Sequence, residues 1–177
     1  MLTIKNVTLR NFLSCGNVTQ TIELSKNGLS LVLGENLDLG GNGSRNGVGK
    51  STILQAISFG LYGESLTNIK KDNLINKING KNMFVSIEFE TNGHTYRIER
   101  GRKPNIFKYI VDNKNISEEA TDEAQGESRD TQKEINELLG MSHTMFKHIV
   151  ALNTYTEPFL SLGAAKQREL IEELLGI

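Results

Sequence analysis

Residues 47–52, Gly-Val-Gly-Lys-Ser-Thr, combine the groups that bind a polyphosphate in proteins. Glycines let successive backbone N–H groups converge on phosphate oxygens, and the N-terminus of a following helix adds about half a positive charge. Lys50 would reach the β- and γ-phosphates, and the Ser51 hydroxyl would ligate Mg²⁺. The pattern therefore predicts a site for a nucleoside triphosphate with Mg²⁺.

The start of this loop can be aligned in two ways. The strict form, Gly-x-x-x-x-Gly-Lys, requires a glycine five places before Gly49, where the chain has Ser44. In the first alignment Gly43 or Ser44 opens the loop, and residues 34–42 form an entry loop. In the second, Gly34-Glu35-Asn36 opens it, about ten residues (37–46) are inserted, and Asn46-Gly47 restores its closing part. We favour the second, because Gly34 directly follows an apolar segment.

The elements around the loop follow from hydrophobic patterning. Residues 29–33, Leu-Ser-Leu-Val-Leu, predict a short strand covered on both faces that leads into the loop. After Gly49, the spacing of apolar residues predicts a buried helix of about three turns, with Gly60 and Gly63 as its stop. Residues 2–10 and 18–24 alternate and predict two earlier strands.

The second half of the chain predicts hairpins followed by helices. Asn92-Gly93 lies between two alternating runs, which is a strong signal for a β-hairpin, and residues 106–116 predict a further strand and turn. The acidic residues 117–130 predict a mobile loop. Helical patterns follow, with Gly140 as a C-cap and Ser142 as an N-cap, and a final apolar run over residues 164–177 is compatible with the start of a coiled coil.

Composition favours one intracellular, soluble domain. The chain has 177 residues, 37% of them hydrophobic, a single cysteine that excludes an internal disulfide, and no apolar run long enough for a membrane span. The formal net charge of −1 neither demands nor excludes a nucleic-acid partner. One hairpin is locally basic and could contact DNA phosphates; it contains Arg97, Arg100, Arg102, Lys103 and Lys108.

Segments along the whole chain resemble one family. "LTIKNVTLRNFLSCGN", "LSLVLGEN" and "GVGKSTILQAISFGLYG" resemble the N-terminal lobe of ABC-type ATPases related to the structural-maintenance-of-chromosomes (SMC) proteins, in particular the ATPase subunits of double-strand-break repair nuclease complexes. "INKINGKN", "YRIERGRKPNIF" and "LLGMSHTMFKHIVALN" are similar to the large subunits of the T-even phage recombination endonucleases. The resemblance implies an α/β fold: a mixed sheet with a P-loop helix, antiparallel β-hairpins and a C-terminal helix leading toward a coiled coil.

The resemblance also implies roles for individual positions, with ATP and Mg²⁺ as cofactors. Asn11 and Phe12 match the end of the first strand, beside the nucleotide, whereas Leu13 stands where many relatives have a basic residue. The family's metal-contacting glutamine would fall near Asn153, which offers a similar amide oxygen, so Ser51 and Asn153 are the expected metal contacts. The expected nucleotide-binding residues are Asn11, Phe12, Gly34, Asn36, Asn46, Gly47, Val48, Gly49, Lys50, Ser51 and Thr52.

No catalytic residue is expected within this chain. Hydrolysis in this class needs an apolar strand ending in Asp-Glu, and the nearest candidate, "YIVDN", has no acid after Asp112. Residues 160–170 have a weak similarity to the family's signature motif, but Leu162 fills a required glycine place, which favours an ordinary helix. ATP hydrolysis is therefore expected only after completion by a C-terminal lobe and dimerisation, and the chain alone is expected to be inactive.

The implied arrangement is one N-terminal ATPase lobe over residues 1–177. It comprises the P-loop with its insertion (33–52), a β-hairpin region (83–116), a helical region (129–163) and the start of a coiled-coil helix (164–177). The implied partners are a C-terminal ATPase lobe, a second copy of the head, a metal-dependent nuclease subunit and double-stranded DNA, with no membrane, in the cytoplasm of a bacterium or an infected host cell. A chromosome-tethering head without a nuclease is the alternative, and a small-molecule P-loop kinase is a third possibility.

Overall fold

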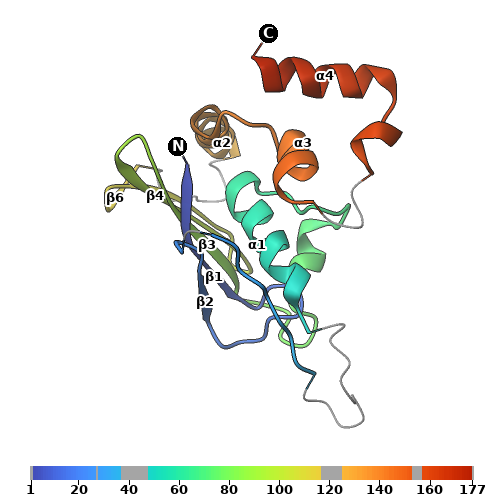
Figure 1. The fold of residues 1–177 in the computed structure, drawn as a ribbon. Coiled ribbons are helices and arrows are strands. Elements are labelled where there is room, and N and C mark those ends of the chain that lie inside the picture. Colours follow the sequence, from blue (N-terminus) through green and yellow to red (C-terminus); the bar gives the residue numbers. More distant parts are fainter. Residues whose placement is uncertain (1, 27, 37–47, 117–124, 153–156, 177) are drawn as a thin grey trace.

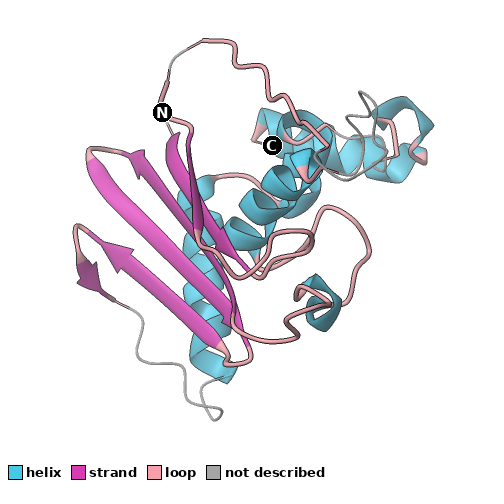
Figure 2. Ribbon diagram, turned by 90° about the horizontal axis from the view of Figure 1, so that it is seen from below, coloured by secondary structure: helices cyan, strands magenta, loops and turns pink. Residues whose placement is uncertain are grey.

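The fold is a twisted antiparallel sheet with helices packed on one face (Figures 1 and 2). The computed structural model describes residues 2–26, 28–36, 48–116, 125–152 and 157–176. Six strands lie in the order β2-β1-β3-β4-β5-β6, and each pairs with its neighbours in antiparallel fashion. They are β1 (Thr3–Arg10), β2 (Gln20–Glu23), β3 (Met83–Thr91), β4 (His94–Arg102), β5 (Ile106–Val111) and β6 (Lys114–Asn115).

Helix α1 (Lys50–Tyr62) crosses the central strands and forms the core with them. Val85, Ile87 and Phe89 point from β3 toward the helices and are fully buried. Gly60 allows the close approach, because a Cβ at this position would collide with Cγ1 of Ile87. The predicted helix is therefore confirmed, and Gly63 caps it in the left-handed conformation, whereas Gly60 lies inside the helix.

Turn chemistry accounts for the outer strands. Asn92 and Gly93 both adopt positive φ angles (52° and 82°), which the tight turn between β3 and β4 requires. Asp112 and Asn113 (47° and 65°) do the same between β5 and β6. The predicted Asn-Gly hairpin and the further strand and turn are both confirmed.

Within the described residues, five helical elements follow the last strand in sequence. They are α2 (Gln125–Leu139), α3 (His143–Met145), the π turn η2 (Phe146–Val150), the 3-10 turn η3 (Phe159–Ser161) and α4 (Ala164–Leu175). A further 3-10 turn, η1 (Lys71–Leu74), precedes β3. Gly140 ends α2, and the Ser142 side chain accepts a hydrogen bond from the Met145 N–H, so both predicted caps are confirmed.

The predicted loop over residues 117–130 is wrong in its second half. Residues 125–130 belong to α2, and residues 117–124 lie outside the described part of the chain. The acidic, polar composition suits a loop, but it also suits the solvent face of a helix whose other face is apolar. Here Ile135 is fully buried, and Leu138 and Leu139 pack against the core, which holds α2 in place.

The predicted strand over residues 29–33 is also wrong. These residues form no regular element in the structure, and Leu29, Leu31, Val32 and Leu33 are all exposed. A strand needs a neighbour to pair with and a surface to cover it, and no described strand lies beside this segment. The described sheet is consequently antiparallel throughout.

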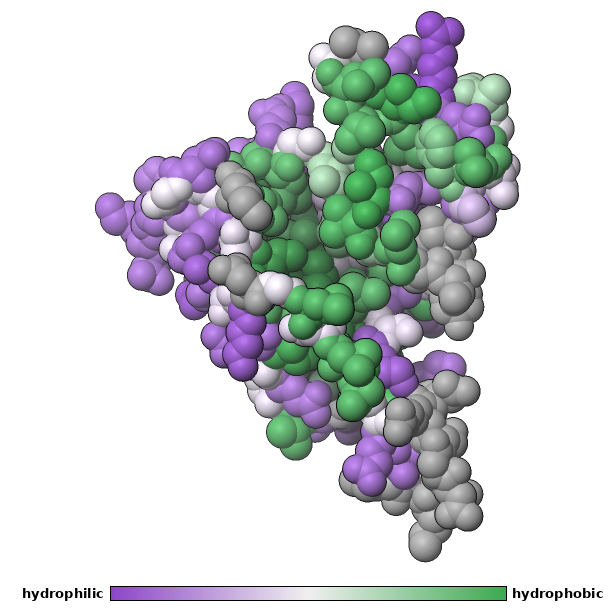
Figure 3. All heavy atoms as spheres, viewed as in Figure 1, coloured by the Kyte–Doolittle hydropathy of each residue, from purple (hydrophilic) through white to green (hydrophobic). Residues whose placement is uncertain are grey.

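Apolar side chains gather in a band on the face shown in Figure 3. Besides residues 29–33, exposed large apolar side chains occur in or directly after the last helical elements; they are Ile149, Val150, Leu152, Leu160, Ile171, Leu174 and Leu175. Among the described helices, none is long and apolar enough to cross a membrane.

Candidate nucleotide site

The two ends of the predicted phosphate loop lie side by side. A Cβ built on Gly34 would collide with Cγ2 of Val48 and would lie 3.5 Å from Nζ of Lys50. Residue 34 therefore has to be glycine for the backbone to pass Val48 this closely. This arrangement is compatible with the second alignment, in which Gly34 opens the loop, and that alignment stays a prediction. Asn36, half-buried, follows two residues later.

Gly49, Lys50, Ser51 and Thr52 form an open helix N-terminus. Gly49 adopts a left-handed conformation (φ 87°), no side chain caps α1, and no acidic residue occupies its first turn. The Thr52 N–H donates to the Gly49 carbonyl (3.0 Å), and Ser51 is exposed. Such an end favours an anion, because the helix dipole and its terminal N–H groups point outward.

Ser14 completes one wall of this site and was missed from the sequence. Oγ of Ser14 lies 2.9 Å from Oγ1 of Thr52. A Cβ built on Gly49 would lie 3.0 Å from Oγ of Ser14. The residues after β1 therefore pack directly against the first turn of α1. A lone serine carries no signal of such a contact, because its partner is 38 residues away.

The predicted residues Asn11 and Phe12 fix the segment that presents Ser14. The Asn11 side chain is 1% exposed; its Nδ2 donates to Oδ1 of Asn17 (3.0 Å) and its Oδ1 accepts from Nδ2 of Asn79 (2.8 Å). Phe12 is fully buried and packs on the Phe59 ring, with ring centroids 5.8 Å apart. These side chains position the loop, and a direct contact of either residue with nucleotide remains a prediction.

A turn before β3 holds the same segment from the other side. Nδ2 of Asn76 donates to the Leu13 carbonyl (2.9 Å), and the Leu13 N–H donates to the Leu74 carbonyl (2.7 Å). Oδ1 of Asn76 in turn accepts from the N–H groups of Ile78 and Asn79, both at 3.1 Å. Because every one of these groups is paired, the wall is fixed without a bound ligand.

The other predicted positions fall in three places. Val48, Gly49, Lys50, Ser51 and Thr52 come together with Gly34, whereas Asn46, Gly47 and Asn153 lie outside the described residues. Asp112, the nearest match to a catalytic acid, lies in the β5–β6 turn. There its carboxylate contacts Nδ1 of His94 (2.6 Å) and accepts a hydrogen bond from the Thr95 N–H (3.0 Å). Both hydrogen bonds lower the pKa of Asp112, and the one to His94 has the larger effect.

The basic hairpin is only partly available as a surface. Arg100 points inward: its Nε donates to the Gly60 carbonyl (2.8 Å), and its guanidinium stacks 4.3 Å from the Phe107 ring centroid. Burial lowers the pKa of Arg100 to about 9. Arg102 forms an ion pair with Asp72. Arg100 therefore stabilises the end of α1, and the remaining basic residues of the hairpin are left as candidate contacts.

Leu162, in the segment with a weak similarity to the signature motif, is buried. It packs with Met145 and Leu170 in a small cluster under α4. Among the described residues, no group of three or more histidine, cysteine or acidic side chains is arranged to hold a metal ion. The metal contact of Ser51 therefore rests on the loop pattern.

Comparison with known proteins identifies relatives over nearly the whole chain. Exonuclease subunit 2 of Enterobacteria phage T4 is 38% identical over 176 residues, which cover 98% of this chain and 28% of the phage protein. DNA double-strand break repair Rad50 ATPase of Methanocaldococcus jannaschii is 31% identical, over 98% of this chain and 15% of that protein. A subunit of nuclease SbcCD from Deinococcus radiodurans is 33% identical, over 74% of this chain and 15% of that subunit.

This chain thus spans less than a third of the length of these relatives. The family described as AAA domain matches residues 6–176, which include every described strand and helix except the first residues of β1. The chain therefore belongs to the AAA-domain family, and within it to the ABC/SMC-type ATPases, whose N-terminal lobe it matches in sequence and in fold.

Proposed function

We propose that this chain is the ATP-binding half of a DNA-repair or recombination ATPase. The observation that carries the proposal is the close approach of Gly34 to Val48 and Lys50 at the uncapped N-terminus of α1. A glycine-walled turn with a lysine at a helix N-terminus suits a triphosphate and suits few other ligands. The relatives' printed names, a repair ATPase and two nuclease subunits, support the same assignment.

Each residue of the proposed site has a separate role in binding ATP and Mg²⁺. The left-handed Gly49 turns the backbone so that the first N–H groups of α1 face the phosphates, and Lys50 supplies the charge for the β- and γ-phosphates. Ser51 is exposed, and its hydroxyl would ligate Mg²⁺. When bound, Mg²⁺ neutralises phosphate charge and orients the γ-phosphate. Ser14 and Thr52 brace the loop from the side.

The exposed apolar segment over residues 29–33 supports completion by a C-terminal lobe. Residues 29–33 lead directly into the phosphate loop, and yet Leu29 and Leu31 have no cover within the described chain. A partner lobe that supplied adjacent strands would cover these side chains and could bring the missing catalytic carboxylate. The domain organisation that we propose is the one expected from the sequence, a single lobe over residues 1–177 whose last helix, α4, would lead toward a coiled coil.

A second head and ATP would then form the switch. The γ-phosphate can contact both subunits of a dimer, so its binding energy stabilises a closed state and hydrolysis removes that stabilisation. The closed dimer would bind double-stranded DNA and regulate an associated nuclease. The nuclease link favours this function over a chromosome-tethering head, because two relatives are named as nuclease subunits.

The test is Lys50→Ala, with Lys133→Ala on the exposed face of α2 as a matched control. We expect Lys50→Ala to abolish tight ATP·Mg²⁺ binding in calorimetry while the circular dichroism spectrum stays unchanged, and Lys133→Ala to bind like the wild type. Unchanged affinity of the Lys50 variant would refute the assigned loop. The purified chain should show almost no turnover, and robust ATPase activity on its own would refute the half-site proposal.

A further inference from the structure

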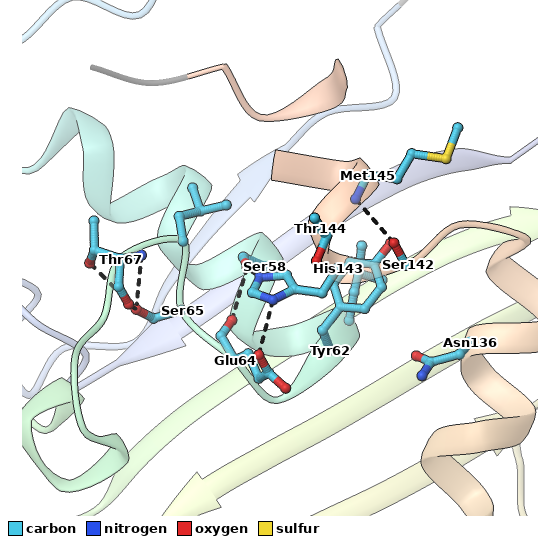
Figure 4. Close-up of polar contacts among 12 residues, drawn as sticks. Ser58, Tyr62, Glu64, Ser65, Thr67, Asn136, Ser142, His143, Thr144 and Met145 are labelled. Atoms are coloured by element: carbon cyan, nitrogen blue, oxygen red, sulfur yellow. Dashed lines mark hydrogen bonds and ion pairs between the residues drawn. The ribbon is translucent and has the colours of Figure 1, made fainter. Parts of the chain in front are cut away.

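A three-way polar contact joins the far end of α1 to α3 (Figure 4). Oγ of Ser58, in the last turn but one of α1, lies 2.8 Å from Nε2 of His143 and donates to the Glu64 carbonyl (2.8 Å). Nδ1 of His143 lies 3.1 Å from Oε2 of Glu64. Serine, histidine and a carboxylate thus stand in the order that a hydrolase uses.

Burial excludes a nucleophilic role for this serine. Ser58 is 0% exposed and lies within α1, so a substrate has no route to its oxygen. The carboxylate of Glu64 only accepts hydrogen bonds, so Nδ1 of His143 donates to it and Nε2 is the acceptor; the Ser58 hydroxyl then shares its single proton between Nε2 and the Glu64 carbonyl, each 2.8 Å away. Burial, and next the Lys147 ammonium, lower the pKa of His143, while Glu64 opposes them. The contact therefore links the buried Ser58 of α1 to His143 of α3, with the exposed Glu64 carboxylate on its outer side.

Tyr62 reinforces the link. Its ring packs against the rings of His143 and Phe146, with centroids 5.1 and 5.3 Å apart, and its hydroxyl donates to the Met141 carbonyl (3.2 Å). Burial, and in second place the Glu173 carboxylate, raise the pKa of Tyr62. The last turn of α1 is thus joined to α3 by an aromatic stack as well as by hydrogen bonds.

The same short helix anchors α4. The Ser142 N–H and hydroxyl donate to the two carboxylate oxygens of Glu173, at 2.6 and 2.8 Å. Leu170 is the buried residue of α4 and packs with Met145 and Leu162. Residues 142 and 143 are adjacent in sequence, so one end of the link holds α1 and the other holds α4.

We propose that His143 couples the nucleotide helix to α4: movement of α1 displaces His143, and Ser142 passes that displacement to Glu173. The nucleotide part of this inference rests on the proposed function, since ATP would bind at the opposite end of α1. A path for movement is present beyond α3, where the π turn η2 closes with the Ala151 N–H donating to the Phe146 carbonyl (2.8 Å). A π turn holds one residue more than an α-helical turn, so a shift of one residue can convert one into the other.

The first experiment needs no nucleotide. Amide hydrogen exchange of α4 is measured in the full 177-residue chain for Ser58→Ala, His143→Gln and the double variant. His148→Gln is the matched control, because Nδ1 of His148 contacts the Thr144 carbonyl of its own segment (2.7 Å) and, within the described chain, no hydrogen bond joins it to α1 or α4. We expect Ser58→Ala to speed exchange in α4 about fivefold, as for the loss of one buried hydrogen bond, and the double variant to add nothing to His143→Gln.

Two results would overturn the coupling. One is a Ser58→Ala effect confined to α1 and its neighbours in the core; the other is additive behaviour of the two substitutions. If His143→Gln does not fold, Glu64→Ala replaces it in the same cycle, because Glu64 is largely exposed and alanine removes the acceptor of Nδ1 of His143.

The second experiment adds ATP·Mg²⁺ and separates this inference from the proposed function. We expect ATP to change exchange in α4 of the wild type, and His143→Gln to bind ATP with the same affinity but to lose that change. An equal change in both proteins would overturn the inference. If the wild type does not bind ATP, the proposed function fails, and the nucleotide-free cycle still decides whether Ser58 and α4 are coupled.

Discussion

The sharpest prediction concerns Gly34, whose missing side chain lets the two ends of the phosphate loop meet. In Gly34→Ala the new Cβ would collide with Cγ2 of Val48 and approach its Cβ to 3.2 Å. Overpacking of this kind costs about 1–3 kcal/mol. If the loop relieves the clash by moving Val48 and Lys50 away from the phosphates, that energy is lost from binding, and the affinity for ATP·Mg²⁺ should fall by about 5- to 150-fold.

The geometry also predicts the rescue. Val48→Ala removes Cγ2 and leaves the 3.2 Å contact with Cβ of residue 48 and an ordinary 3.5 Å contact with Nζ of Lys50, so the double variant Gly34→Ala/Val48→Ala should recover most of the affinity. Gly163→Ala is the control, because a Cβ there would have no atom within 4 Å and the backbone needs no positive φ. Calorimetric titration with ATP·Mg²⁺ measures all four proteins. Equal affinity of wild type and Gly34→Ala, or an unrescued double variant, would refute the packing argument.

Three further predictions concern other contacts. Gly60→Ala should lower the free energy of unfolding in urea by up to about 2 kcal/mol, since the clash with Ile87 costs about 1–3 kcal/mol and better helix propensity offsets about 1 kcal/mol; a more stable variant would contradict this. Because burial lowers the pKa of His143 in the fold, the unfolded chain binds more protons there, so stability should fall as the pH drops below about 6.5. Urea melts at pH 7.5 and 5.5 should show this loss in the wild type and less of it in His143→Gln. Ser14→Ala leaves Thr52 without its hydroxyl partner and should weaken ATP·Mg²⁺ binding several-fold with little change in melting temperature, whereas Ser14→Thr should retain binding.

Local signals in the sequence were sufficient for the turns and caps. Asn92-Gly93, Gly63, Gly140 and Ser142 act through their own backbone conformations or through atoms within a few residues, so composition at each position predicts the structure there. The same holds for the open N-terminus of α1, because the sequence itself shows Gly49 at the N-cap position and no acidic residue in the first helical turn.

Contacts between distant residues were not predictable in this way. Ser14 meets Thr52, and Ser58 meets His143, across separations of 38 and 85 residues, and single hydroxyls give no hint of such partners. The composition of residues 125–130 predicts a loop, yet these residues form the first turns of α2, which is held in place further along by the buried Ile135. The failure over residues 29–33 has the opposite cause, because an apolar pattern predicts a covered strand whether or not the covering surface belongs to the same chain.

Those exposed residues also bear on how this lobe behaves by itself. The run from Leu29 to Leu33 has no charge and no proline, which is the composition that stacks into intermolecular cross-β structure when it is left uncovered. Lys26 and Glu35, both exposed, flank the run and act as gatekeepers, because their charges would be buried against like charges in an in-register stack. These two side chains would therefore protect against aggregation, beside the proposed phosphate loop and its close approach at Gly34.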